Sequence, residues 1–250
     1  MTGTPVLATR GLSKSFGGVR AVDGVDLALP KGEICALIGP NGAGKTTFFN
    51  MLTGQLRPDK GEVSFKGERL SGLPPHAVWR RGISRTFQIT ATFVSLTALE
   101  NVQVARLSHR RRTYSVLARA AHLEVEAGRR LLDRVGLSDQ AGRAAAVLSY
   151  GDLKKLELAV ALANDPEVLL LDEPTAGMAP AERGALMALV ERIARDHGLA
   201  VLFTEHDMDV VFSVADRILV LHQGRVIAEG RPTEVRVDPE VQRVYLGEGE

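Results

Sequence analysis

Residues 39–47 carry the strongest structural signal in this chain of 250 residues. They fit the pattern G-x-x-x-x-G-K-[ST] and read Gly39-Pro40-Asn41-Gly42-Ala43-Gly44-Lys45-Thr46-Thr47. An apolar run at 34–38 precedes them and is short enough to be a buried strand, and 46–52 reads as the first turns of a helix. The glycines let the backbone bend so that its N–H groups face inward, and the helix N-terminus adds positive potential. We therefore expect all nine residues to bind the phosphates of a nucleotide, with Lys45 at the terminal phosphates and the Thr46 hydroxyl on Mg²⁺.

The composition is that of a soluble globular protein without a strong charge bias. Hydrophobic residues make up 45% of the chain, and 31 Lys and Arg stand against 30 Asp and Glu, so we expect no nucleic-acid partner. No window approaches the ~18 consecutive apolar residues that a membrane span needs, and residues 1–5 lack the features of a signal peptide. These observations predict a cytoplasmic protein. The lone cysteine, Cys35, is interpreted as a small core residue rather than a reactive thiol.

The order of strand-like and helix-like segments indicates an α/β fold. Early strands are expected at Val6–Thr9, Val22–Leu29, Glu33–Ile38, Gly61–Lys66 and Ile83–Phe87. The pattern is helical from about Leu96 to Ala163. Strands and helices then alternate as Val168–Leu171, helix 181–196, Ala200–Thr204, helix 207–214 and Arg217–His222. A strand at Arg225–Ala228 and two short helices within 232–246 complete the chain. The alternation predicts a parallel sheet covered by helices on both faces.

Two carboxylates end one of the expected buried strands. Asp172 and Glu173 follow an apolar run, and the carboxyl ends of parallel strands lie where ligands bind in such sheets. Asp172 can hold Mg²⁺, and Glu173 can orient or deprotonate an attacking water. A solvated strand end is the alternative, and the nucleotide loop in the same chain favours the functional interpretation.

A second corner that can bind an anion precedes the expected helix at 153–163. Ser149 and Gly151 lie at the start of this helix, where backbone N–H groups are unpaired. Taken alone, this pattern is an ordinary helix N-cap. Its place between the nucleotide loop and the two carboxylates is what indicates a ligand-binding role.

Four motifs in this order resemble those of ATP-binding cassette (ABC) ATPases, and the resemblance covers about residues 6–246. The motifs are the loop 39–47, the corner 149–151, Leu171-Asp172-Glu173-Pro174-Thr175 and Thr204-Glu205-His206. The resemblance implies a P-loop NTPase core with a mostly parallel sheet, an N-terminal antiparallel β region and an inserted helical lobe. We expect a single domain over 1–250, with its core at about 1–90 and 164–230, the lobe at about 91–163 and a C-terminal extension at about 231–250.

The resemblance also implies roles for three further residues. Phe16 matches the aromatic residue that stacks on adenine, although a packed core phenylalanine is the alternative. Gln88 matches the glutamine that contacts Mg²⁺ and water and links to the transmembrane partner. His206 matches the switch histidine at the γ-phosphate, where the alternative is a histidine at a strand end.

In this family two subunits sandwich two ATP molecules. The catalytic residues are then Glu173, His206 and Lys45, and the metal ligands of the Mg²⁺ cofactor are Thr46, Gln88 and Asp172. The corner of Ser149 and Gly151 completes the nucleotide site of the other chain. A loop alone leaves one side of the γ-phosphate open to water, and a partner's helix N-terminus closes it.

Several segments are similar to the importer subunits for branched-chain and other hydrophobic amino acids, and to the longer of that group's two ATPases. They are Ser15-Phe16-Gly17-Gly18, Arg85-Thr86-Phe87-Gln88, Glu100-Asn101-Val102, Glu205-His206-Asp207-Met208, Asp238-Pro239-Glu240-Val241 and Val244-Tyr245-Leu246-Gly247. This implies a peripheral protein on the inner face of the cell membrane. Its partners would be a second, identical or paralogous ATPase subunit, permease subunits contacted through a groove near Gln88 and, indirectly, a substrate-binding protein.

The arginine-rich stretch 103–134 has two interpretations. The simpler one is a solvated helix face, and the other is an approach to lipid headgroups or to a permease loop. Replacing Arg110, Arg111 and Arg112 and measuring membrane recruitment would separate the two.

The chain departs from the family at two places. The corner usually reads Leu-Ser-Gly-Gly-Gln, whereas this chain has Tyr150 and Asp152, and Ala179 stands where relatives carry Asp or Asn. A negative charge at Asp152 suits a helix start but weakens attraction for a partner's triphosphate. Alternatives that stay open are a transporter for urea or another small solute, a soluble ABC ATPase of the iron–sulfur assembly type, and a non-hydrolysing nucleotide sensor. A GTPase is disfavoured, because the sequence contains no Asn-Lys-x-Asp motif.

Overall fold

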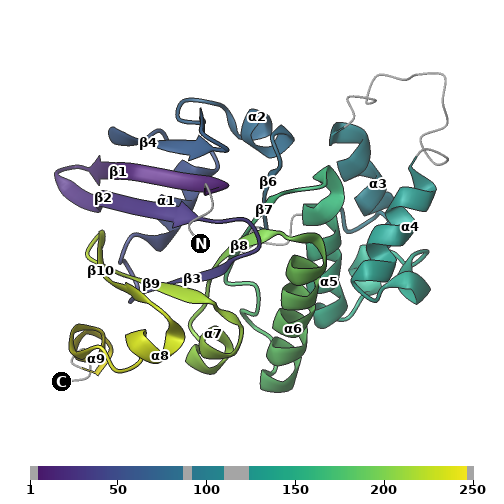
Figure 1. Cartoon of the computed structure of the whole chain (residues 1–250). Helices are drawn as coiled ribbons and strands as arrows, with labels where there is room; N and C mark the ends of the chain where they lie inside the picture. The colour runs from purple at the N-terminus through teal and green to yellow at the C-terminus, as the bar shows by residue number, and fades with distance from the viewer. Residues whose placement is uncertain (1–4, 87–91, 110–123, 247–250) are drawn as a thin grey trace.

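The structure is a computed structural model that describes residues 5–86, 92–109 and 124–246 of the chain. Figure 1 shows a layer of antiparallel strands, a second sheet beneath it, and helices that cover that second sheet. The expected α/β class, with an antiparallel β region, a mostly parallel sheet and a helical lobe, is confirmed.

The larger sheet has six strands in the order β10-β9-β3-β8-β7-β6. Their bounds are β3 Ile34–Ile38, β6 Ile83–Arg85, β7 Val168–Asp172, β8 Ala200–Thr204, β9 Arg217–His222 and β10 Arg225–Gly230. All neighbours pair in parallel except β10, which is antiparallel to β9. Because β3, β8 and β7 are adjacent and parallel, the segments that follow them meet at one edge of the sheet.

The smaller sheet is antiparallel, in the order β2-β1-β4-β5. Its bounds are β1 Leu7–Phe16, β2 Val19–Leu29, β4 Lys60–Phe65 and β5 Glu68–Arg69. The prediction that the first strand ends at Thr9 is wrong, since β1 continues to Phe16. Register shifts between Thr9 and Ser15, with Gly11 at a φ of 56°, break the alternation that marks a strand in sequence.

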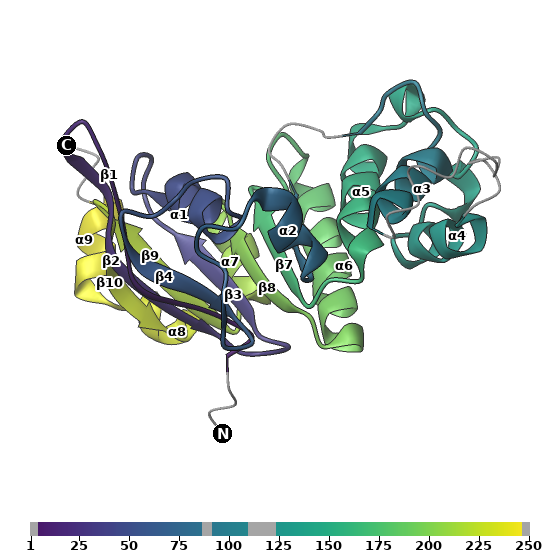
Figure 2. The ribbon, with the colours of Figure 1, turned by 90° about the horizontal axis from the view of Figure 1, so that it is seen from above.

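Helices connect these strands and cover the six-stranded sheet. Their bounds are α1 Lys45–Leu52, α2 Pro75–Arg80, α3 Ala98–His109, α4 Val125–Arg134, α5 Tyr150–Ala161, α6 Pro180–His197, α7 Met208–Val214, α8 Pro232–Val235 and α9 Pro239–Leu246. In both views α3 and α4 lie at one end of the molecule and α8 and α9 at the other (Figures 1 and 2). No helix in the described part of the chain is long and apolar enough to cross a membrane.

The central strands bury both of their faces. On β3, Ile34, Ala36 and Ile38 pack into one apolar cluster with the helices, while Cys35 and Leu37 pack into a second cluster with α1 and the antiparallel sheet. The α1 helix therefore lies between the two sheets, which fixes the loop before it. Cys35 is fully buried as expected, and burial raises the pKa of its thiol to about 12.

Candidate functional site

The loop between β3 and α1 has backbone geometry that only glycine accommodates at two positions. A Cβ on Gly39 would lie 2.0 Å from the carbonyl oxygen of Leu221, and one on Gly44 would lie 2.1 Å from that of Ala21. Gly44 also has a φ of 106° and is the N-cap of α1. These two glycines bring the loop close to the neighbouring backbone, and its chain then enters α1 with unpaired N–H groups at the helix start.

Lys45 folds back onto this loop. Its Nζ donates hydrogen bonds to the carbonyl oxygens of Gly39, at 2.6 Å, and Pro40, at 3.0 Å. Desolvation lowers the pKa of Lys45, and the negative charges of Glu173 and Asp172 oppose that shift. The lysine and the two acids, which are far apart in sequence, therefore share one electrostatic environment. Such an environment suits a triphosphate that needs a cation on one side.

Asp172 ends β7 with both carboxylate oxygens engaged. Its Oδ1 accepts a hydrogen bond from Thr204 Oγ1 at 2.9 Å, and its Oδ2 accepts one from Arg85 Nη2 at 2.7 Å. Arg85 also donates to Asn50 Oδ1, on α1, at 2.7 Å. The side chain of Asp172 is thus held in one orientation by groups on β8 and β6. Arg85 was part of a sequence motif without an assigned role, and a charge at the end of a short buried strand is the signal that could have singled it out.

Glu173 and His206 point toward each other from the ends of β7 and β8. Glu173 Oε1 lies 2.9 Å from His206 Nε2, and about a fifth of the glutamate side chain is exposed. The Glu173 backbone adopts a φ of 49°, and its N–H donates to Thr204 Oγ1 at 3.0 Å. A carboxylate and an imidazole in contact at the open edge of a sheet are suited to accept and hold a proton.

The donors near Lys45 fit Mg²⁺. Thr46 lies exposed in the first turn of α1, and Asp172 supplies a buried carboxylate. The third expected ligand, Gln88, lies outside the described residues. Within the described residues no group of three His, Cys, Asp or Glu side chains could hold a metal ion. Magnesium commonly takes one or two protein oxygens together with water and substrate phosphates, so a hydroxyl and a carboxylate are an adequate set.

Phe16 ends β1 with its ring half exposed. Lys14 Nζ lies 5.7 Å from the ring centroid. The alternative of a packed core phenylalanine does not describe this ring. A half-exposed ring can receive a flat ligand on its face.

The corner of Ser149 and Gly151 starts α5. Ser149 is the N-cap, and its Oγ accepts a hydrogen bond from the Asp152 N–H at 3.2 Å. Asp152 pairs with Lys155 at 3.0 Å. Among the described residues, no hydrogen bond joins this corner to the loop 39–47 of the same chain.

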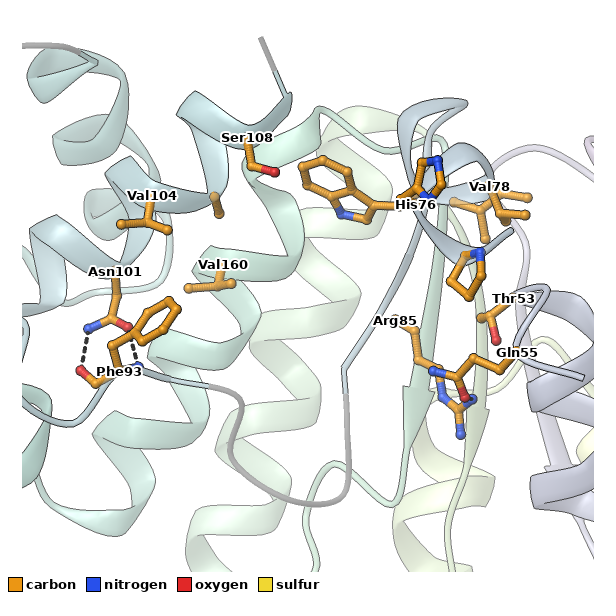
Figure 3. A pocket seen from close by; sticks show the side chains of 14 residues that line it. Thr53, Gln55, His76, Val78, Arg85, Phe93, Asn101, Val104, Ser108 and Val160 are labelled. Carbon is orange, nitrogen blue, oxygen red and sulfur yellow. Dashed lines mark hydrogen bonds between the residues drawn. The ribbon is translucent and has the colours of Figure 1, made fainter. Parts of the chain in front are cut away.

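A groove of about 390 Å³ lies between α2, α3, α5 and the end of α1. Figure 3 shows Val104 and Val160 on one side, His76 and Val78 on the other, and Arg85 near Gln55 at the base. Phe93, at its margin, is held by two hydrogen bonds between its backbone and the Asn101 side chain, at 2.7 and 3.1 Å. Sequence analysis named Arg85 and Asn101 only within motifs and missed α2, because the residues that line this groove come from separate segments of the chain.

Family models match two parts of this chain. One described as ABC transporter matches residues 22–176, and one described as branched-chain amino acid ATP-binding cassette transporter matches residues 225–250. The chain is 41% identical over 253 residues to the high-affinity branched-chain amino acid transport ATP-binding protein BraF of Pseudomonas aeruginosa, with 98% of each protein covered. It is 41% identical over 259 residues to the protein LivG of Escherichia coli, which has the same description, again with 98% of each covered.

Two solved structures share the fold over nearly their full length. The first is a nucleotide-free ATP-binding cassette from an ABC transporter, with a TM-score of 0.85 and 32% identity over 96% of this chain and 98% of the other. The second is the ADP conformation of MJ1267, an ATP-binding cassette of an ABC transporter, with a TM-score of 0.88 and 32% identity over 98% and 100%.

Proposed function

Because this chain belongs to the ABC transporter family, we propose that it hydrolyses ATP to energise the import of branched-chain amino acids across the cell membrane. One observation carries the enzymatic part of the proposal, namely the gathering at one sheet edge of Lys45, Asp172, Glu173 and His206. In this proposal the chain is one domain with a core at about 1–90 and 164–230, a helical lobe at about 91–163 and a C-terminal extension at about 231–250.

The residues at this edge have distinct tasks in hydrolysis. The amides of the loop 39–47 and the Lys45 ammonium bind the phosphates, and the half-exposed ring of Phe16 receives the adenine. Thr46 and Asp172 hold Mg²⁺ together with Gln88, and bound Mg²⁺ neutralises charge on the phosphate oxygens.

The attacking water is activated by Glu173, which accepts its proton. His206, at 2.9 Å from that carboxylate, orients it and stabilises charge at the γ-phosphate. The positions of the two groups at the ends of adjacent parallel strands support these roles.

A second chain is needed to complete each site. The Ser149 and Gly151 corner of one chain caps the nucleotide bound by the other, since a single loop leaves the γ-phosphate open to water.

Two substitutions test the enzymatic part of the proposal. Glu173→Gln keeps the side-chain size but removes the base, so phosphate release should fall at least ~100-fold while ATP is retained and a closed dimer accumulates. Lys45→Ala should lose tight nucleotide binding, because it removes the cation that makes charge-assisted hydrogen bonds to the phosphates. Phosphate release, fluorescent-nucleotide binding and gel filtration measure these effects. Turnover that is unaffected by Glu173→Gln would instead favour a different base, and a wild-type chain without turnover would favour a nucleotide sensor.

The permease contact is proposed at the groove between α2 and α3. The valine and phenylalanine side chains at its rim are apolar and substantially exposed, at 39% for Val104 and 56% for Phe93. Val104→Asp should reduce recovery of the chain with membranes, and Val237→Asp should not, because Val237 is 68% exposed beyond α8. Equal recovery of both variants would argue against this contact, and recovery with soluble proteins alone would favour an iron–sulfur assembly ATPase.

The cargo is tested by replacing LivG in Escherichia coli with this chain. Restored uptake of radiolabelled leucine, isoleucine and valine is expected if the chain can energise a branched-chain amino acid permease. Glu173→Gln in the same replacement is the negative control. Folded, membrane-recruited chain without amino-acid uptake would contradict the cargo, and a parallel urea uptake assay covers the alternative solute.

A further inference from the structure

Tyr150 connects the corner at the start of α5 to the loop 174–179, which follows the catalytic carboxylates. Its Oη donates a hydrogen bond to the carbonyl oxygen of Ala176 at 2.8 Å. Among the described residues this is the one hydrogen bond that joins the corner to the loop.

The tyrosine ring also packs against the loop. A Cβ on Gly177, which has a φ of +79°, would lie 3.2 Å from Tyr150 Oη and 3.5 Å from two ring carbons. Lys154 Nζ also lies over the ring, 5.6 Å from its centroid. Gly177 thus provides both the turn and the space for the ring, and Lys154 limits the positions that the ring can take.

The loop is tied to the segment that carries His206 at two more points. Thr175 donates from its N–H, at 2.8 Å, and from its Oγ1, at 2.6 Å, to Glu205 Oε1. Arg183 donates from Nε to the Met178 carbonyl oxygen and from Nη1 to Asp207 Oδ2, both at 2.9 Å. Because these acids flank His206 in sequence, a displacement of the loop is transmitted to both sides of that histidine.

We propose that Tyr150 is a positioning residue that couples the two nucleotide sites of the dimer. The inference rests on the proposed function, in which the corner contacts the partner's ATP while Glu173 and His206 act on the chain's own ATP. A shift of the corner moves the Ala176 carbonyl through the hydroxyl, and the loop carries that shift to the catalytic pair. The occupancy of one site thereby alters turnover at the other.

The same bond contributes little to the stability of the folded chain. Tyr150 is 47% exposed, and water competes for a hydrogen bond at such a position. A change of Tyr150 that keeps the ring should therefore affect coupling between sites far more than folding.

Tyr150→Phe tests this inference, because it removes only the hydroxyl. In the full chain, we expect the Hill coefficient of ATP hydrolysis to fall measurably below the wild-type value, with kcat at saturating ATP changed by less than about twofold. The urea midpoint of unfolding should stay that of the wild type. Val147→Ala, an exposed position just before the corner, is the matched control and should keep the wild-type Hill coefficient.

Trapping the ATP-bound dimer distinguishes coupling between the two nucleotide sites from the capping of each site by Ser149 and Gly151. In a Glu173→Gln background, Tyr150→Phe should still give the ATP-bound dimer, because Ser149 and Gly151 are intact. Three outcomes would each overturn the inference. They are loss of that dimer, an unchanged Hill coefficient, and a lower Hill coefficient that accompanies a lower urea midpoint. A wild-type Hill coefficient of 1 with normal turnover would overturn the coupling alone, whereas absence of turnover in the wild type would refute the proposed function as well.

Discussion

Arg85 and Asp172 face each other with less than a tenth of either side chain exposed. A buried ion pair contributes little net stability compared with apolar residues, but the removal of one partner leaves an uncompensated charge. Arg85→Met should therefore lower the free energy of unfolding by about 3–5 kcal/mol in urea denaturation. The Arg85→Met, Asp172→Asn double variant removes both charges, so it should be more stable than Arg85→Met alone. The structure shows a desolvated ion pair. A free energy of unfolding for Arg85→Met within about 1 kcal/mol of the wild-type value would contradict that, because solvated pairs contribute this little.

Asp152 places a negative charge where the family usually has a neutral glutamine. Burial raises the pKa of Asp152, but hydrogen bonds from Lys155 and Ser149 outweigh burial, so its pKa lies below the ordinary value and the carboxylate is ionised at neutral pH. The charge stabilises the start of α5, and in the proposed dimer it would repel the partner's triphosphate. Asp152→Gln should lower the KM for ATP about twofold to fivefold, which corresponds to the 0.3–1 kcal/mol typical of a charge at a helix end.

The effect of Asp152→Gln is measured in steady-state ATP hydrolysis at several salt concentrations. It should weaken as salt rises, because exposed charges are screened. Asp139→Asn, on the short helix Ser138–Gln140 before the corner, serves as a control for a general change in net charge. A KM that is unchanged in Asp152→Gln would show that this carboxylate does not face the partner's nucleotide.

The elements of the core are joined by a carboxylate at the start of β9. Asp216 accepts hydrogen bonds from Arg195, on α6, at 2.7 and 2.9 Å, and from the N–H of Ile34, on β3, at 2.8 Å. Burial raises the pKa of Asp216, and these hydrogen bonds outweigh it, so the pKa lies below its ordinary value of 3.8. A carboxylate whose pKa is lowered by folding stabilises the folded state at any pH above its pKa in the unfolded chain. This contribution is lost as the pH falls through the pKa that the group has in the folded chain.

Asp216→Asn should consequently make the stability of the chain less dependent on pH in acid. We expect the wild type to lose more of its urea midpoint between pH 5 and pH 3 than the variant does, with the variant less stable at pH 7. Asp196→Asn, at an exposed position of α6, is the control. Parallel pH profiles for the wild type and Asp216→Asn would contradict the assignment.

Sequence patterns located the elements of the parallel sheet well and the short connecting elements poorly. The strands at Ala200–Thr204 and Arg217–His222 have the predicted bounds, because buried parallel strands are continuous apolar runs. The helix Pro75–Arg80 was missed, since six residues are too few for a helical period to be recognised. The groove could not be predicted for the same reason, because α2 forms one of its walls.

The candidate site shows a similar division. The sequence places Asp172, Glu173 and His206 at or just after strand ends and Lys45 at the start of the helix that follows β3, and the rule that such ends share an edge predicts their proximity. The contacts of Arg85 and Tyr150 depend on how elements pack across the molecule, and no local pattern reports on that. The roles of the site residues remain predictions that the substitutions above test.

The whole chain provides two separate ligand surfaces, and this has a consequence for its kinetics. Lys45 and the loop 39–47 belong to one chain, so a single chain should bind nucleotide, and binding should depend on protein concentration less steeply than turnover does. In the proposed mechanism turnover needs the corner of Ser149 and Gly151 from a second chain, so phosphate release per chain should fall on dilution below the dimerisation constant. Binding of a fluorescent ATP analogue and phosphate release, measured over the same dilution series, give the two curves.

Nucleotide binding serves as the control for phosphate release, because loss of protein on dilution would lower both signals. Ser149→Arg should abolish the concentration dependence together with turnover, since a large cation replaces the cap, while nucleotide binding is retained. Turnover that stays proportional to protein at every dilution would mean that one chain closes its own site. The hydrogen bond from Tyr150 Oη to the Ala176 carbonyl oxygen argues against that, because it holds the corner against loop 174–179 of its own chain. In the proposed mechanism the corner therefore caps a triphosphate on a second molecule.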